Sequence, residues 1–98
     1  MDTNQPLTAS LTLLEFCQAT RLERREVHEL IGFGIIAVTA DEHFDSEQVV
    51  RCIKARRLQH DLELDLHSVA LVLDLLDQNR HMQRRLQHLE QLIQRLHN

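Results

Sequence analysis

Apolar residues recur with helical spacing along most of this chain, and polar capping residues interrupt them at a few places. The first helical stretch begins where Thr12 and Glu15 form the two ends of a capping box, in which the threonine hydroxyl accepts from an early backbone N–H. Leu11 and Phe16 flank this box in the positions of a hydrophobic staple. We therefore predict a short first helix that ends near Thr20.

A second helix is predicted from about Glu23 to Ile31, with one buried side formed by four apolar residues, Leu22, Val27, Leu30 and Ile31. Gly32 stands where a left-handed C-cap belongs. Two short helices joined by a tight turn form a helix-turn-helix unit. The glycine often found in such a turn is absent, and Arg21 occupies the region.

The segment that follows is short and β-branched, Ile35-Ile36-Ala37-Val38-Thr39, which favours a strand. Ala40-Asp41-Glu42 can turn the chain back through His43 and Phe44. The pattern therefore predicts a small two-stranded wing.

Two further helix starts follow the wing. Asp45 begins the first, with Gln48 in the capping-box position, and this helix is expected to reach about Leu62 and to bury Val49, Cys52, Ile53 and Leu58. Asp65 is the next predicted N-cap. Residues 69–76 are then apolar nearly all round, so this segment is expected to be deeply buried or covered by a partner.

The C-terminal stretch carries a heptad repeat of apolar residues, Met82, Leu86, Leu89, Ile93 and Leu96. Extended backwards, the repeat keeps Val72, Leu75 and Asn79 in register. Asn79 is either a polar position that sets the register of a coiled coil or a break between two helices. Two copies of the stretch would close the apolar seam, so the repeat predicts a homodimer. In a parallel pair, Arg85 would face Glu90.

Together these elements predict a mainly α fold, a winged helix-turn-helix with a C-terminal dimerisation helix. The expected division is a leader over residues 1–10, either loose or a short strand, a helix-turn-helix-like domain with a small wing over 11–78, and a coiled-coil helix over 79–98. Two glycines and one proline leave few turn positions, which agrees with long helices.

The net charge of −4 is unevenly distributed: residues 1–50 hold nine acidic residues against three arginines, and residues 51–98 hold eight basic against six acidic ones. No apolar run approaches about 18 residues and no basic segment precedes an apolar one, so neither a membrane span nor a signal peptide is predicted. Cys17 and Cys52 could form a disulfide, but two reduced, buried thiols in a cytosolic chain are the preferred interpretation.

The predicted second helix and wing have the wrong charge for a DNA reader. Phosphate contacts require lysine and arginine, but the helix carries Glu23, Glu26 and Glu29 and the wing turn Asp41 and Glu42. The counterargument is a set of basic residues that could touch a DNA backbone, namely Arg21, Arg24, Arg25, Arg51, Lys54, Arg56 and Arg57. The glutamates could also form an ordinary solvated helix face.

Neither metal binding nor catalysis is predicted. His60 and His67, like His81 and His88, are seven residues apart, not the four that would bring two imidazoles to one metal. No phosphate-binding loop, nucleophile elbow or triad-like sequence occurs. We expect no enzyme, no cofactor and no metal.

The most suggestive feature is an acidic run, Asp61-Leu62-Glu63-Leu64-Asp65, followed by Asp74 and Asp77. With its apolar rim of Leu62, Leu66 and Leu73, this patch could receive a basic amphipathic helix of another protein. A polar link between helices with ordinary caps explains the same residues.

The ordered string of segments resembles the bacterial chaperone modulator CbpM family over essentially residues 11–97. The segments are Leu11-Thr12-Leu13-Leu14-Glu15-Phe16-Cys17, Val27-x-Glu29-Leu30-Ile31-Gly32-x-Gly34-Ile35-Ile36 and Ala55-x-Arg57-Leu58-x-His60-Asp61-Leu62-x-Leu64-Asp65, with the leucine-rich stretch that ends in Asp77. That family is similar in plan to the MerR regulators, whose Arg-Tyr-Tyr recognition segment is absent here.

The resemblance implies a bacterial cytoplasmic protein that binds the J-domain of a DnaJ-like co-chaperone of the CbpA type and blocks its stimulation of Hsp70. It also implies an antiparallel dimer helix, as in MerR-like proteins. We expect the J-domain contacts among Asp61, Glu63, Asp65, Asp74 and Asp77, with Glu26 and Glu29 as a second choice. The rival hypotheses are a MerR-type DNA-binding transcriptional regulator and a general coiled-coil adaptor.

Overall fold

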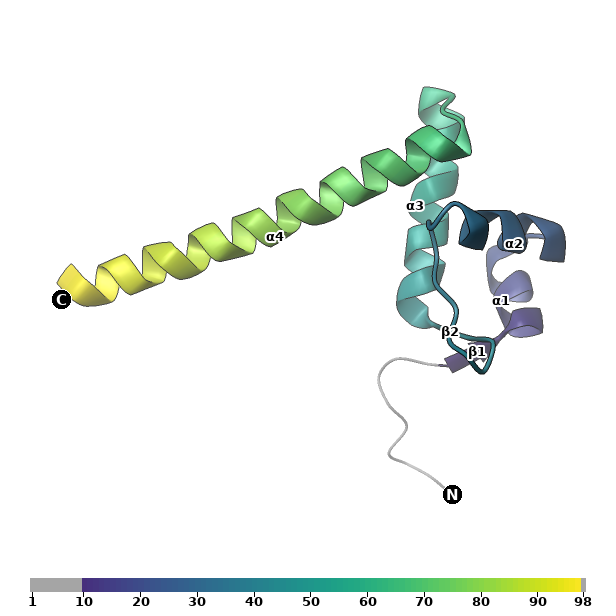
Figure 1. Ribbon diagram of the computed structural model, residues 1–98, viewed down its shortest axis with the longest axis horizontal. Coiled ribbons are helices and arrows are strands. Elements are labelled where there is room, and N and C mark those ends of the chain that lie inside the picture. Colours follow the sequence, from purple (N-terminus) through teal and green to yellow (C-terminus); the bar gives the residue numbers. More distant parts are fainter. Residues whose placement is uncertain (1–9, 98) are drawn as a thin grey trace, which may run out of the picture.

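A computed structural model of the chain describes residues 10–97 as a small helical head from which one long helix projects (Figure 1). The head contains α1 (Leu13–Thr20), α2 (Arg24–Gly32), α3 (Ser46–Leu62) and a two-stranded sheet. The long helix is α4 (Leu66–His97). The mainly α class is therefore confirmed. Except for Ser10, the predicted leader over residues 1–10 lies outside the described residues.

The helix-turn-helix unit forms as predicted from its caps. The Thr12 hydroxyl accepts the N–H of Glu15 at 3.2 Å, and the Glu15 carboxylate accepts the N–H of Thr12 at 2.9 Å, which completes the capping box. Arg21 ends α1 in the left-handed conformation, with φ of 61°, and so takes the position usually held by glycine.

The end of α2 corrects one prediction. Gly32 is the last helical residue and not the left-handed cap; Gly34, with φ of 75°, has that role. The N–H of Gly34 donates to Ile31 O and the N–H of Ile35 donates to Leu30 O, both at 3.0 Å, the two bonds of a Schellman motif. Burial of both Leu30 and Ile35 fixes this exit direction.

The predicted wing is wrong in its pairing. Residues 35–39 form no strand; instead β1 (Ser10–Thr12) pairs antiparallel with β2 (His43–Asp45), with Leu11 opposite Phe44. Ile35 and Ile36 are both buried, whereas neighbouring residues of a strand point to opposite faces. Because both side chains are buried, this segment lies against the core as an irregular loop and not as a strand. A tight turn closed by the N–H of Thr39 donating to His43 O leads into β2.

Helix α3 starts at the predicted cap, where Asp45 accepts the N–H of Gln48 at 3.2 Å. Its inner side buries Cys52 and Ala55, while Ile53, predicted to be buried, is 47% exposed. Both cysteines are free thiols; Cys52 is buried, as predicted, but Cys17 is only partly buried. Burial raises the pKa of the Cys52 thiol. The core is closed by Phe16 stacked on Phe44, with ring centroids 4.3 Å apart.

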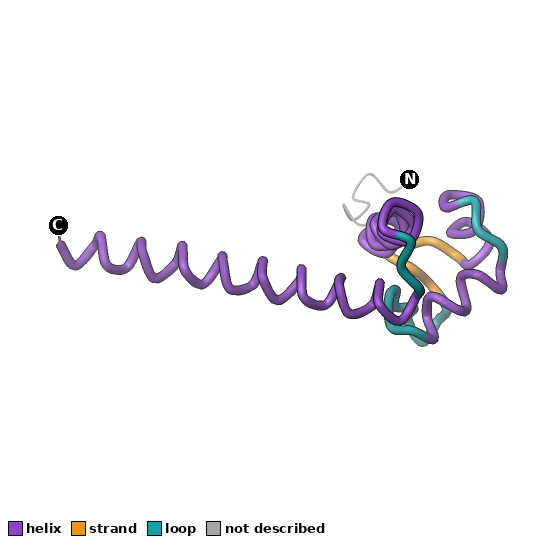
Figure 2. Tube along the Cα trace, turned by 90° about the horizontal axis from the view of Figure 1, so that it is seen from above, coloured by secondary structure: helices purple, strands orange, loops and turns teal. Residues whose placement is uncertain are grey.

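Helix α4 begins where Asp65 accepts the N–H of Ser68 at 2.8 Å, as predicted. It then runs for 32 residues, about 48 Å at a rise of about 1.5 Å per residue. The helix passes through Asn79 without interruption, so Asn79 does not break it. Val69 and Leu73 bury its first turns against the head, and its C-terminal half extends away from the head (Figure 2).

Candidate partner-binding surfaces

Five carboxylates expected to contact a partner lie at the end of α3, in the link to α4 and along the first half of α4. We call them the acidic group: Asp61, Glu63, Asp65, Asp74 and Asp77. Asp61 lies in the last turn of α3, and Glu63 follows it as a left-handed C-cap with φ of 52°. Asp74 and Asp77 lie further along α4. These five residues differ in whether their carboxylates are already bonded within the chain.

Two members of the acidic group are engaged within the chain. Asp65 accepts both a backbone and a side-chain hydrogen bond from Ser68, and these bonds lower the pKa of its carboxyl. Asp77 is paired with two arginines, Arg51 at 2.7 Å and Arg80 at 2.9 Å. The carboxylates of Asp65 and Asp77 therefore already have structural roles.

The other three members are exposed to solvent. The only bond recorded within residues 10–97 for their side chains is a 3.4 Å contact between Asp61 and the ring of His60. Apart from that contact, none of the three carboxylates forms an ion pair within residues 10–97, so their oxygens are open to an incoming cation. Asp61, Glu63 and Asp74 thus have the character of a binding surface.

An apolar groove lies beside Asp61. Its cavity of about 350 Å³ runs between α3 and α4 and is lined by Lys54, Arg57, Leu58, Asp61, Leu62, Leu73 and Leu76. Leu62 and Leu73 were predicted to rim the acidic patch and do line this groove, whereas Leu66 is half-buried elsewhere in the core. Leu62 is 60% exposed, so apolar surface of the groove is accessible to a partner. Lys54 and Arg57 make its charge mixed, a feature that the sequence pattern did not indicate.

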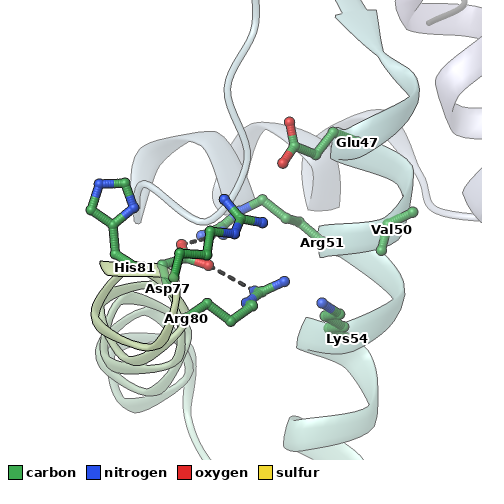
Figure 3. A pocket seen from close by; sticks show the side chains of 8 residues that line it. Glu47, Val50, Arg51, Lys54, Asp77, Arg80 and His81 are labelled. Atoms are coloured by element: carbon green, nitrogen blue, oxygen red, sulfur yellow. Dashed lines mark hydrogen bonds and ion pairs between the residues drawn. The ribbon is translucent and has the colours of Figure 1, made fainter. Parts of the chain in front are cut away.

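A second cavity, the cationic cleft, opens between α3 and α4 next to Asp77 (Figure 3). Its volume is about 310 Å³, and its lining comprises Glu47, Val50, Arg51 and Lys54 from α3 with Asp77, Arg80, His81 and Arg84 from α4. Figure 3 shows Asp77 between the side chains of Arg51 and Arg80. Sequence reasoning missed this cleft because the two halves of its lining are separated by more than 20 residues and have no shared motif.

The second-choice residues lie on α2, on the other side of the head from α4 (Figure 1). Glu26 accepts the backbone N–H of Glu23 at 2.9 Å and so helps to cap its own helix. Glu29 is exposed, as are Arg24 and Arg25 at the start of the helix. The helix that would read DNA in a helix-turn-helix protein thus has two arginines at its N-terminal end and an exposed glutamate further along.

One side of α4 exposes a row of apolar side chains that is interrupted at Asn79. We call this row the apolar stripe: Leu71, Leu75, Met82, Leu86, Leu89, Ile93 and Leu96. At about 3.6 residues per turn, the stripe lies opposite Val69 and Leu73, the residues that pack on the head. Leu71 and Leu75 are more than half exposed. Residues 69–76 were expected to be deeply buried or covered by a partner. Only one side of this segment is buried in the head, and the opposite side is exposed.

Residues 10–97 contain no group of three histidine, cysteine or acidic side chains arranged to hold a metal ion. Within the same described range, no helix has both the length and the apolar character needed to cross a bilayer.

Comparison with known proteins matches residues 11–91 to the family described as MerR HTH family regulatory protein. Chaperone modulatory protein CbpM of Citrobacter koseri is 34% identical over 94 residues, which cover 92% of this chain and 90% of that protein. Chaperone modulatory protein CbpM of Escherichia coli O1:K1 / APEC is 29% identical over 93 residues, which cover 91% of this chain and 92% of that protein. These names denote regulators and modulators, which are non-enzymatic kinds of protein.

Proposed function

The chain belongs to the MerR HTH family of regulatory proteins and to the chaperone modulatory proteins CbpM, and from this membership we propose that it is a non-catalytic inhibitor of a co-chaperone. It binds the J-domain of a DnaJ-like co-chaperone of the CbpA type in the bacterial cytoplasm. The bound J-domain cannot then stimulate Hsp70.

The observation that carries this proposal is the exposure of Asp61, which lines the apolar groove, with the exposed Glu63 two residues later in the chain. A basic amphipathic helix needs both features, since its apolar side requires a groove and its cationic side requires carboxylates at the rim. Complementary charge also speeds encounter and fixes the orientation of the partner. Covering a basic helix of the J-domain would prevent Hsp70 from using it.

Within the acidic group, we propose Asp61, Glu63 and Asp74 as the direct contacts. Asp65 and Asp77 would have to exchange internal hydrogen bonds for external ones, which cancels much of the gain. Glu29 remains the second choice, and Glu26 is less suited because it caps α2.

We further propose that the protein acts as a homodimer closed by the apolar stripe. The predicted seam residues Met82, Leu86, Leu89, Ile93 and Leu96 are all more than half exposed in the single chain. An exposed row of this length is unfavourable in water and is typical of a helix that pairs. The MerR plan favours an antiparallel pair, in which each α4 runs back towards the head of the other copy.

The alternative is a MerR-type transcriptional regulator, which the exposed Arg24 and Arg25 at the N-terminal end of α2 favour. Those two arginines lie at the end of the recognition helix that contacts base edges in helix-turn-helix proteins. Glu29 on the same helix and Asp41 and Glu42 in the turn oppose binding to a polyanion.

Titration calorimetry with a purified J-domain of this co-chaperone class tests the proposal. Asp61→Lys combined with Glu63→Lys should weaken binding by about tenfold or more and reduce its salt sensitivity. The control is Asp41→Lys with Glu42→Lys, which makes the same charge change in the turn before β2. Equal affinity of both variants for the J-domain would contradict the acidic surface, and tight, salt-dependent binding of the natural protein to duplex DNA would favour the regulator.

A further inference from the structure

The cationic cleft has a chemistry opposite to that of the acidic group, and its lining shares only Lys54 with the apolar groove of the function proposed above. Four of its lining residues are permanently cationic, namely Arg51, Lys54, Arg80 and Arg84, and two are carboxylates, Glu47 and Asp77. The cleft therefore carries a net charge of +2, in a chain whose net charge is −4. Such a local excess of the opposite sign attracts anions selectively.

Two of the guanidinium groups are held in place before any ligand arrives. Arg51 donates through Nε to the carbonyl of Ile35 at 2.7 Å and through Nη1 to Asp77 at 2.7 Å. Arg80 donates through Nη2 to the other oxygen of Asp77 at 2.9 Å. Because these bonds restrict both side chains, less conformational entropy is lost when an anion binds.

The other two cations have no such engagement. Among residues 10–97, neither Lys54 nor Arg84 makes a recorded hydrogen bond or ion pair, and they lie on opposite walls of the cleft. A carboxylate between them would be held from both helices. Arginine is suited to this task because its planar fork can donate two parallel hydrogen bonds to one carboxylate.

The cleft stays open in the proposed dimer. At about 3.6 residues per turn, Asp77, Arg80 and Arg84 lie on the side of α4 opposite Leu75, Met82 and Leu86 of the apolar stripe. Pairing through the stripe leaves this side facing outwards. Arg95 adds a further cation on the same side of α4, towards its C-terminal end.

We infer that the cationic cleft is a second interaction site, which binds an acidic segment of a partner polypeptide along the outer side of α4. A peptide carboxylate needs only the local charges of the cleft. A duplex is a continuous polyanion that would extend beyond the cleft, where the net charge of −4 of the chain opposes it. The inference does not depend on the identity of the protein that the acidic group binds.

Fluorescence anisotropy of a labelled oligoglutamate peptide tests this site with the full chain. Lys54→Glu combined with Arg84→Glu should weaken binding of the peptide by about tenfold or more, because both unengaged cations are reversed. The matched control is Arg24→Glu with Arg25→Glu, the same charge change on exposed residues of α2, and its affinity should stay within about twofold of the natural protein. Circular dichroism establishes that both variants are folded.

A second measurement does not depend on the variants. Amide chemical shifts of the natural protein, followed as the peptide is added, should move around Lys54 and along α4 from Asp77 to Arg84. The inference is overturned if the natural protein fails to bind the peptide, if both variants lose affinity equally, or if a duplex oligonucleotide of similar charge binds more tightly. Lys54 also lines the apolar groove, so the two sites are separated with Arg84→Glu alone, which should weaken peptide binding and leave J-domain binding unchanged.

Discussion

Arg51 of α3 and Asp77 of α4 form a 2.7 Å ion pair that joins the projecting helix to the head beyond its last buried leucine. Arg51 is the more enclosed partner, with 19% of its side chain exposed, and it also donates to the carbonyl of Ile35. The pair therefore connects three segments: the chain after α2, the first half of α3 and the first half of α4.

Replacing Asp77 by alanine should lower the free energy of unfolding by about 1 kcal/mol. The loss arises because Arg51 keeps its enclosed position without a counter-charge, and it stays small because Asp77 is 44% exposed and water screens the pair. Urea denaturation followed by circular dichroism measures the change.

Asp74→Ala is the control for this prediction, since Asp74 is an exposed acid on the same helix with no recorded bond within residues 10–97. Its free energy of unfolding should stay within about 0.5 kcal/mol of the natural protein. If the two variants were equally destabilised, the ion pair would have no measurable share in holding α4 to the head.

The two glycines at the end of α2 should respond in opposite directions to alanine. Gly34→Ala places a Cβ at φ of 75°, which should cost about 1 kcal/mol. Gly32→Ala lies inside the last helical turn and should be neutral or stabilising by up to about 1 kcal/mol. A Cβ added at either position would meet no atom within 4 Å, so the backbone conformation alone makes the difference. The midpoints of thermal unfolding of the two variants test this prediction. If Gly32→Ala were the less stable variant, Gly32 and not Gly34 would be the left-handed cap.

Acid should destabilise the protein partly through Asp65. Its folded-state pKa lies below the ordinary value of 3.8, so the ionised carboxylate favours the folded state. This contribution is complete above 3.8 and is lost as the pH falls through 3.8 towards the lower folded pKa.

Asp65→Asn removes the titration but keeps a side-chain oxygen that can cap α4. The natural protein should therefore be the more stable of the two at neutral pH, and the difference should shrink when urea denaturation is repeated below pH 3.8. A difference that is the same at both pH values would show that the charge of Asp65 does not contribute.

Local signals predicted the helices of this fold well. The caps at Thr12, Asp45 and Asp65 each depend on a hydrogen bond that spans three residues, so the sequence around them contains the whole interaction. The long-range pairing of Leu11 with Phe44 has no such local signature. A β-branched run looked like the missing strand, but burial of both Ile35 and Ile36 excludes the alternation that a half-buried strand requires.

Of the candidate surfaces, the sequence predicted the features that are contiguous or periodic, but not the ion pairs between distant residues. The acidic run and the heptad repeat are periodic or contiguous features, and family membership agrees with the resemblance that those segments carry. The sequence could not indicate which carboxylates are engaged internally. Asp77, unlike Asp74, has an arginine three residues later, Arg80, but the sequence could not indicate that Arg51, 26 residues away, also pairs with it.

The apolar stripe of α4 should determine the oligomeric state, and Leu89 is its most direct test. Leu89 lies near the middle of the predicted seam and is 52% exposed in the single chain. Leu89→Lys would remove one buried leucine from each copy, about 2 kcal/mol each. A total of about 4 kcal/mol corresponds to a dimer dissociation constant raised by about a thousandfold.

Gln91→Lys provides the matched control, because it adds the same charge two residues away on the side of α4 that faces away from the stripe. Sedimentation equilibrium over a range of concentrations should show the Gln91 variant and the natural protein as dimers and the Leu89 variant as a monomer. Helix content should remain in all three, since lysine is as good a helix former as leucine and the first turns of α4 pack on the head. A natural protein that sediments as a monomer at tens of micromolar, an order-of-magnitude choice for a marginal coiled coil, would remove the dimer and leave the stripe to another partner.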